Sequence, residues 1–394
     1  MIPAIYPTRV PALVTGTGNT TLGTIRALGR KGIPAFVGHA SAGYEAASRW
    51  YQPVPGGWSA DSLVDNLRRC SLKHAVLMPT SDTAALAAAT LPPDLKARFP
   101  SSSADGDLTR WLIDKDHLAR LLVTHDVPHP RTWSLTHPDD IRNLDDATLE
   151  HSFLKPRDSI RFTARFNKKS IRPRGREALL ATHADLVLQG FEMVLQEFIP
   201  GPPTNCYLID GHVDRNGAVS GVFARQRVRQ YPLDFGNSSA LQSIPLGNVS
   251  AAWDILSKFL KDIGYRGIFN AEFKQHPDDG GFRLLEVNPR AWWYVEFAAR
   301  CGVDTVTMAY EDALGLSVSG GEGYDVGRRV IYPYFDLAAC RAMRRTGDIS
   351  LTEIVRWWSG AEQMIYAADD PRPFVVATRD LISGYIGKRL RPQT

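Results

Sequence analysis

Two glutamates in apolar segments are the residues of this sequence best suited to metal chemistry. Glu272 lies in the segment NAEFK, and Glu286 lies in the segment LLEVNPR fourteen positions later. A tight turn over residues 277–281 would join the two segments as neighbouring strands and set the carboxylates side by side. Asn288 would then lie on the same strand face as Glu286, because alternate residues of a strand share a face.

Paired carboxylates in apolar surroundings need a cation between them, or one of them must be protonated. Carboxylate and amide oxygens suit hard cations, and Mg²⁺ usually leaves its other positions to phosphate oxygens and water. The pattern therefore predicts a site for Mg²⁺, or for Mn²⁺ in its place, next to a nucleoside triphosphate. The alternative is a structural hairpin whose glutamates form ion pairs with Lys274, Arg283 or Arg290.

The elements that must position these residues begin with an alternation of strands and helices. Short apolar runs are followed by segments with helical spacing, and glycine or proline ends several of them. Such an alternation predicts an α/β fold with a doubly wound parallel sheet. The expected strands are 11–15, 35–37 and 75–78, and the expected helices are 22–30, 62–69 and 83–90.

Beyond residue 107 the pattern changes. A helix is expected over 108–123, with Asp114, Lys115 and Asp116 near its middle, and a basic, irregular stretch follows the segment FLKP as far as Arg176. The last eighty residues give no clear pattern. The other expected strands are 153–156, 192–199, 206–209, 221–228, 267–274 and 282–287, and the other expected helices are 177–189, 251–263 and 298–314.

The chemical motifs occur in an order that resembles the ATP-grasp superfamily. The resemblance covers roughly residues 1–315 and starts with an alternating domain that has a glycine-rich first turn. Several matches in one order are far more specific than any single motif. The matched motifs are Asp114-Lys115, Lys155 in FLKP, the segment QEFIPG from Gln196 to Gly201, the set Glu272, Glu286 and Asn288, and Arg290 just past that set.

The resemblance implies that ATP binds between two lobes of an ATP-grasp region. The backbone of the QEFIPG segment would contact the adenine, and two lysines would contact the phosphates. Three further side chains would hold one or two Mg²⁺ ions. The implied nucleotide-binding residues are Lys115, Lys155, Gln196, Glu197, Phe198, Ile199 and Asn270, and the implied metal ligands are Glu272, Glu286 and Asn288.

Within the superfamily, the chain looks closest to carboxylate–amine ligases near the D-aspartate ligase-like and biotin-carboxylase-like members. This resemblance implies that a carboxylate attacks the γ-phosphate of ATP to give an acyl phosphate. An amine then displaces phosphate, and an amide, ADP and phosphate are the products. The implied catalytic residues are Lys155, Arg290 and Arg227, the two arginines as the groups that stabilise the acyl phosphate.

Basic residues mark two further segments. Arg225, Arg227 and Arg229 alternate along an expected strand and so share one face, where at least one is expected to be functional and the others exposed. The alternative is a solvated strand edge. The loop that would cover the phosphates is normally rich in glycine, but here Gly175 is its only glycine. We therefore expect a cation of this loop to act by charge, and the candidates are Arg161, Lys168 and Lys169.

The motifs divide the chain into three parts. Residues 1–107 form the N-terminal doubly wound domain. Residues 108–318 form the ATP-grasp region, with a small lobe at about 151–197 and a large lobe at about 198–318. Residues 319–394 form a C-terminal extension of undetermined role.

Composition excludes several other classes of protein. A formal net charge of +4 is too small to indicate a nucleic-acid partner, and no run of eighteen apolar residues indicates a membrane span. Four scattered cysteines favour a reducing, cytoplasmic location. The expected partners are small-molecule carboxylate and amine substrates of amino-acid-like type, with no nucleic acid and no membrane, and a homodimer stays open.

Three other functions remain as alternatives. An ATP-grasp enzyme could instead carboxylate or carbamoylate its acceptor with bicarbonate. A non-catalytic ATP-binding regulatory protein is a second alternative, against which the intact set of Lys155, Glu272, Glu286 and Asn288 argues. A NAD-dependent oxidoreductase is the weakest, because Gly16, Gly18 and Gly23 lack the GxGxxG spacing of a dinucleotide fold.

Overall fold

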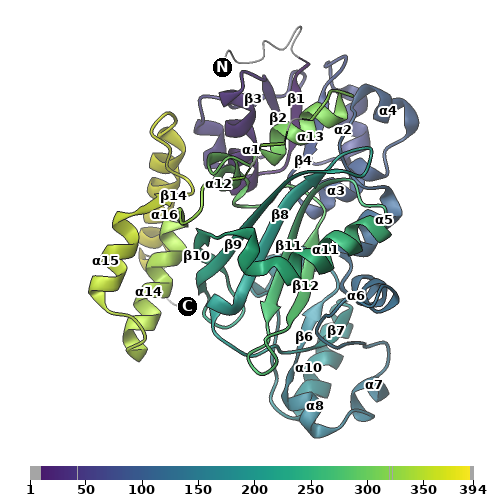
Figure 1. The fold of residues 1–394 in the computed structure, drawn as a ribbon, viewed down its shortest axis with the longest axis vertical. Helices are drawn as coiled ribbons and strands as arrows, with labels where there is room; N and C mark the ends of the chain where they lie inside the picture. The colour runs from purple at the N-terminus through teal and green to yellow at the C-terminus, as the bar shows by residue number, and fades with distance from the viewer. Residues whose placement is uncertain (1–9, 42, 319, 322, 391–394) are drawn as a thin grey trace.

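The computed structural model describes residues 10–41, 43–318, 320–321 and 323–390. Within them the chain forms three sheets, of four, seven and three strands. Figure 1 shows the four-stranded sheet at one end of the molecule, the seven-stranded sheet in the middle and the three-stranded sheet at the other end. The most C-terminal helices lie along one side of the large sheet.

The N-terminal sheet is parallel, as the alternation of strands and helices predicted. Its order is β3-β2-β1-β4, so β1 is central and buried at all four of its positions. The strands are β1 (Ala12–Thr15), β2 (Ala35–Gly38), β3 (Gln52–Pro53) and β4 (Val76–Pro79), and the helices are α1 (Gly18–Arg30), α2 (Leu63–Arg69), α3 (Asp82–Ala89) and α4 (Pro93–Arg98).

A small antiparallel sheet of order β5-β7-β6 forms the centre of the small lobe. Helices α5 (Gly106–Ile113) and α6 (Lys115–Thr124) lead into it from the N-terminal domain. Its strands are β5 (Thr132–Ser134), β6 (Ser152–Pro156) and β7 (Met193–Glu197), and its helices are α7 (Pro138–Arg142), α8 (Asp146–Glu150), α9 (Ser159–Phe166) and α10 (Arg176–Leu188).

The large sheet has the order β12-β11-β8-β9-β10-β13-β14. Its first five strands pair antiparallel, and β13 pairs parallel with β14. The strands are β8 (Cys206–Val213), β9 (Val219–Tyr231), β10 (Asn237–Ser243), β11 (Gly267–Gln275), β12 (Phe282–Asn288), β13 (Arg329–Ile331) and β14 (Ala361–Gln363), and the helices beside them are α11 (Ser250–Asp262), α12 (Val295–Arg300) and α13 (Thr305–Ala313).

The C-terminal part, whose pattern predicted no clear elements, adds an edge to the large sheet. Strands β13 and β14 extend that sheet beyond β10, and three helices flank them. These helices are α14 (Pro333–Thr346), α15 (Leu351–Ser359) and α16 (Arg372–Leu390). The domain limits at residues 107 and 318 stay a prediction, and the sheet itself continues past the second of them.

The prediction of a single helix over 108–123 is wrong, because Asp114 separates two helices, α5 and α6. This residue has extended backbone angles of φ −75° and ψ 123°, and it caps a new helix, α6. Its carboxylate accepts hydrogen bonds from the N–H groups of Asp116 and His117 at 2.9 and 3.1 Å. An aspartate cap followed by helical spacing is a sequence signal for such a start. The break makes Lys115 the first residue of α6.

The stretch expected to be irregular after FLKP contains helix α9. Asp158 caps it by accepting hydrogen bonds from two backbone N–H groups. Phe162 and Phe166, four residues apart, anchor the helix by packing with Phe191 at ring distances of 5.5 and 5.3 Å. Strands β5 and β10 were also not expected, since short or serine-rich segments carry little periodicity.

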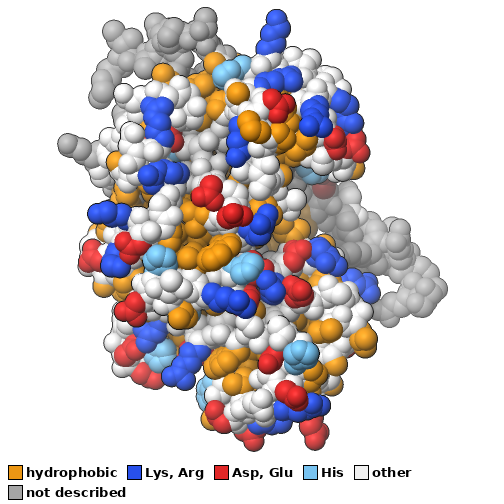
Figure 2. Space-filling view, turned by 90° about the vertical axis from the view of Figure 1, so that its right-hand side faces the viewer, with side chains coloured by type: hydrophobic (Ala, Val, Ile, Leu, Met, Phe, Trp, Pro, Cys, Tyr) orange, Lys and Arg blue, Asp and Glu red, His pale blue; other side chains and the backbone are white. Residues whose placement is uncertain are grey.

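No helix within the described residues is both long and apolar enough to cross a membrane. On the face that Figure 2 shows, basic and acidic side chains are interspersed rather than gathered into one basic stripe.

Candidate active site

The two glutamates lie directly opposite each other on the antiparallel strands β11 and β12. Each has one cation of the protein beside it. Arg227 Nη2 lies 2.8 Å from Oε1 of Glu272, and Lys115 Nζ lies 3.2 Å from Oε2 of Glu286. The pair is therefore held in place by a sheet and neutralised in part by residues from β9 and α6.

Both carboxylates are ionised. Burial by itself would raise the pKa of Glu272, but Arg227 and Lys169 outweigh burial and hold this pKa below its usual value. Burial likewise opposes ionisation of Glu286, and three lysines together hold its pKa well below the usual value. Two adjacent negative charges of this kind attract a further cation.

A purely structural hairpin would pair the glutamates with other cations, and the described structure gives those cations other partners. Lys274 Nζ donates to the carbonyl of Gly201 at 2.9 Å. Arg283 pairs with Asp279 in the turn between β11 and β12. The glutamates instead face cations that come from separate elements of the fold, which is the arrangement of a site.

Two asparagines fix the orientation of Glu286. Asn288 Nδ2 donates to Oε1 of Glu286 at 2.9 Å and to Oδ1 of Asn270 at 3.0 Å. Asn270 in turn donates to Asp210, which is buried and pairs with Arg225 at 2.5 Å. This chain of hydrogen bonds connects the carboxylate pair to the centre of the large sheet.

The three arginines of β9 are all buried, so the expectation that two of them are exposed is wrong. Strand β9 lies between β8 and β10, and it is not a sheet edge. Arg225 faces Asp210, and Arg229 pairs with the buried Asp336 on α14 at 2.7 Å. Of the three, Arg227 is the one beside the carboxylate pair.

A cavity of about 160 Å³ lies between the small lobe and the large sheet, next to the glutamates. Lys155 and Lys169 line it from the small lobe. Aromatic side chains line it too, and Phe235 from the β9–β10 connection packs against Phe153 and Phe198 at ring distances of 4.8 and 6.0 Å. The cavity therefore has both apolar rings that can contact a flat apolar ring and charged groups that can contact phosphates.

Lys155 reaches this cavity from β6. Its Nζ donates to Oε1 of Gln196 on β7 at 3.3 Å. Burial and the nearby Lys115 lower the pKa of Lys155 to about 8, although Glu286 and Glu272 oppose the shift. The ammonium group is thus poorly solvated and close to like charge, and an anionic ligand would relieve both costs.

Glu197 at the end of β7 and the two residues after it, Phe198 and Ile199, line the same cavity. The N–H of Glu197 already donates to the carbonyl of Arg131 at 2.8 Å, and the N–H of Phe198 donates to the carbonyl of His151 at 2.7 Å. Of the three predicted adenine contacts, the N–H of Ile199 has no backbone partner in the part of the chain that the structure describes.

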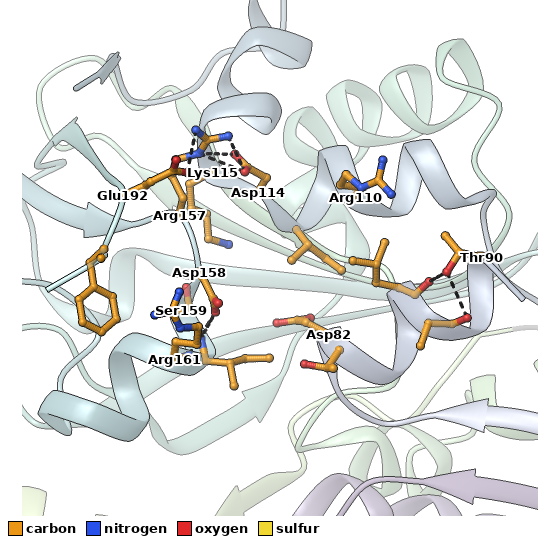
Figure 3. A pocket seen from close by; sticks show the side chains of 17 residues that line it. Asp82, Thr90, Arg110, Asp114, Lys115, Arg157, Asp158, Ser159, Arg161 and Glu192 are labelled. Carbon is orange, nitrogen blue, oxygen red and sulfur yellow. Dashed lines mark hydrogen bonds and ion pairs between the residues drawn. The ribbon is translucent and has the colours of Figure 1, made fainter. Parts of the chain in front are cut away.

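Arg290 lies next to the site rather than on the carboxylate pair. Its Nε is 2.5 Å from Oδ1 of Asp82 at the start of α3, and its Nη2 is 3.4 Å from Oδ1 of Asn288. Asp82 also lines a second, larger cleft of about 720 Å³ between the N-terminal domain and the small lobe. In Figure 3, Asp82 lies on one side of this cleft and Asp158 and Arg161 on the other.

The residues present fit a hard divalent cation. The two adjacent carboxylates are ionised, and an amide group lies two residues beyond Glu286. The described residues contain no cluster of three or more His, Cys, Asp and Glu side chains that could hold a metal alone. A cation at this place would therefore share its coordination with a phosphate ligand, as Mg²⁺ commonly does.

Sequence reasoning assigned no role to two residues of this region. Asp82 directly follows the segment MPTS at the carboxyl end of β4, and carboxyl ends of parallel strands are where ligands bind in open α/β sheets. That position was the available signal. Phe235 carried no such signal, because its place in the cavity depends on the long-range pairing of β9 with β10.

No family model matches the chain. A search of curated proteins finds D-aspartate ligase from Enterococcus faecium, which is 25% identical over 233 residues and matches 56% of this chain. The chain spans about half of that relative, since the match covers 54% of its length.

Solved structures show the same fold at low identity. Phosphoribosylamine–glycine ligase from Thermotoga maritima matches with a TM-score of 0.60 at 14% identity, over 81% of this chain and 78% of that one. Biotin carboxylase from Campylobacter jejuni, in a β-γ-ATP complex, matches with a TM-score of 0.61 at 14% identity, over 82% and 74%. The predicted resemblance to the ATP-grasp superfamily is confirmed, and the chain has the ATP-grasp fold.

Proposed function

We propose that this chain, which has the ATP-grasp fold, is an ATP-dependent carboxylate–amine ligase that forms ADP and phosphate. The observation that carries the proposal is the ionised pair of Glu272 and Glu286 beside a cavity whose opposite wall presents Lys155. Carboxylates on one wall and an ammonium group on the other suit a nucleoside triphosphate bound with a divalent cation.

The nucleotide is oriented by the apolar rings and the charged groups of the cavity. Its adenine lies against Phe235, beside the backbone of Glu197 to Ile199, and its phosphates extend toward Lys155 and Lys115. Gln196 holds the Lys155 ammonium in position through its side-chain oxygen. Phosphoryl transfer requires little more from a protein than positioning and neutralisation of charge.

Glu272, Glu286 and Asn288 would hold Mg²⁺, or Mn²⁺, which supplies neutralisation of the phosphate charge when bound. Asn270 takes part indirectly, because it hydrogen-bonds Asn288 and keeps that amide group next to Glu286. Lys115 stays with Glu286 and points its ammonium group at the same place.

The reaction transfers the γ-phosphoryl group to an oxygen of a substrate carboxylate, and ADP leaves. The nitrogen of an amine then attacks the acyl carbon, the carbon–oxygen bond to phosphate breaks, and the amine loses a proton. Arg290 and Arg227 stabilise the negative charge of the acyl phosphate. Arg290 must exchange its present contact with Asp82 for one with the substrate.

The substrates we propose are small carboxylates and amines of amino-acid-like type. The match to a D-aspartate ligase supports this class, although it covers about half of that protein. The proposal includes no nucleic-acid or membrane partner, and it places the enzyme in the cytoplasm.

To test the ligase proposal, we would measure the release of ADP and phosphate from ATP with Mg²⁺ in the presence of pooled amino acids and small carboxylic acids. Release that requires both a carboxylate and an amine, and that is lost in Glu286→Ala, supports the ligase. Release that requires bicarbonate instead supports a carboxylating enzyme, for which the biotin-carboxylase fold is the precedent. ATP binding without release in any pool supports a regulatory protein.

A further inference from the structure

One cation of the nucleotide cavity has no role in the proposal above. Lys169 lies after helix α9, where the chain returns to the small sheet. The backbone there is fixed, because Ile171 and Leu154 on β6 exchange two hydrogen bonds of 3.0 and 2.8 Å. Position 169 is therefore set by the same strand that carries Lys155.

Lys169 has no ion-pair partner among the described residues. Its side chain lines the cavity together with Lys155, Glu272 and Glu286. Among the described residues, no carboxylate lies within ion-pair distance of its ammonium group, and each of the two nearby glutamates pairs with another cation, Arg227 or Lys115.

The other cations of the same loop are directed elsewhere. Arg161 lines the larger cleft instead, where its guanidinium lies 5.3 Å from the ring of Phe191. Lys168 and Lys169 are both exposed to solvent, but Lys168 does not line the nucleotide cavity. Of the three cations that the sequence left open, Lys169 alone faces the space between the lobes.

We propose that Lys169 is a second phosphate-binding lysine, which acts beside Lys155 on the terminal phosphates of the bound nucleotide. This inference rests on the proposed function, because it takes a nucleoside triphosphate as the ligand. The loop that carries Lys169 has only one glycine, Gly175. We infer that it contacts the phosphates through a side-chain charge and not through backbone N–H groups.

The geometry explains how the charges would be divided. The small lobe supplies Lys155 and Lys169, whereas the large sheet supplies Glu272 and Glu286. Phosphates between the two walls satisfy the ammonium groups directly and reach the carboxylates through the divalent cation. Binding of the triphosphate then depends on charge, and it weakens as salt concentration rises.

The test is calorimetric binding of ATP with Mg²⁺, and of adenosine, to the full chain and to Lys169→Met. We expect Lys169→Met to weaken ATP binding at least about tenfold, as expected for loss of one charge-assisted contact. Adenosine binding should stay unchanged, because adenosine carries no phosphate. Lys169→Arg keeps the charge and should restore ATP binding to within about threefold.

Lys168→Met is the matched control, since it removes the same charge from the neighbouring position. We expect ATP affinity equal to that of the unaltered chain. Unchanged ATP binding by Lys169→Met, or an equal loss of ATP and adenosine binding, would overturn this inference alone. If the unaltered chain binds neither ATP nor adenosine, the proposed function fails and the inference fails with it.

Discussion

At the scale of single residues, the protein's own cations surround the carboxylate pair. Arg227 and Lys115 each contact one glutamate, and Lys155 and Lys169 lie nearby. This explains why two adjacent carboxylates stay ionised in a partly buried site. Each glutamate therefore has two roles: its carboxylate would hold the divalent cation, and its negative charge neutralises the nearby lysines.

We therefore expect Glu286→Gln to lower the rate of ATP-dependent ADP release on the order of 100-fold or more, as loss of metal-assisted catalysis does. The change keeps the size of the side chain and removes its charge. The rate is measured at saturating ATP. Glu353→Gln is the control, because Glu353 lies in an exposed capping contact on α15. Equal rates for Glu286→Gln and the unaltered chain contradict the metal role.

The pKa of Lys155 predicts a pH dependence. Because this pKa is about 8, raising the pH above that value removes the proton and with it the attraction for phosphate. Affinity for ATP should fall by up to about tenfold per pH unit above pH 8. Lys155→Arg stays charged and should abolish the dependence. Calorimetry between pH 7 and 9.5 checks this, and an equal slope in both proteins refutes it.

The same lowered pKa affects folding in the opposite sense. Between about pH 8 and 10.5 the unfolded chain holds the Lys155 proton more tightly than the folded chain does. This residue therefore reduces stability below pH 8, and its unfavourable contribution disappears as the pH rises toward 10.5. A functional charge is kept here at a cost to the fold.

At the scale of elements, the sequence predicted most strands and helices that carry the site. Strands β6, β7, β11 and β12 have apolar runs bounded by turn residues, and such local patterns survive folding. The sequence predicted that Glu272 and Glu286 face each other, because one hairpin turn sets their pairing. The burial of Arg225 and Arg229 could not follow, because it depends on the pairing of β9 with β8, which carries Asp210, and on the packing of the distant helix α14, which carries Asp336.

The junction of α5 and α6 is the element on which Lys115 depends. Asp114 caps α6 and also pairs with Arg157 at 2.8 Å. Asp114→Ala should lower the free energy of unfolding by about 1–2 kcal/mol through loss of the cap. It should also weaken ATP binding, since Lys115 follows directly.

Urea unfolding and calorimetry separate the two effects of Asp114→Ala. Asp145→Ala removes a comparable cap from α8, which is distant in sequence from Lys115. We expect a similar loss of stability in this control and no change in ATP affinity. If both variants bind ATP as the unaltered chain does, the cap serves the fold alone.

At the scale of the whole molecule, a buried ionic cluster fastens the C-terminal part to the N-terminal domain. Asp370 accepts hydrogen bonds from Arg26 Nε at 3.0 Å, Ser48 Oγ at 2.7 Å and the N–H of Arg49 at 2.9 Å. Arg26 also pairs with Glu296 on α12 at 3.2 Å. Three parts of the chain that are remote in sequence therefore meet at one guanidinium.

Asp370→Ala should lower the free energy of unfolding by about 3–5 kcal/mol, because it leaves a buried arginine partly unpaired. The midpoint of urea unfolding measures the change. Asp380→Ala removes only an exposed pair with Arg379 and should cost less than about 1 kcal/mol. Similar midpoints for the two variants would show that the cluster does not fasten the domains.

The position of β13 and β14 in the large sheet has a consequence for biosynthesis. Strand β10 precedes them in the chain but pairs with β13 on its outer side. While the ribosome makes the intervening segment, the outer edge of β10 carries unpaired backbone groups, and such an edge can pair with another nascent chain. The lobe that holds the carboxylates thus completes its sheet only after β13 and β14 have been made, and until then this edge of β10 can pair wrongly with another chain.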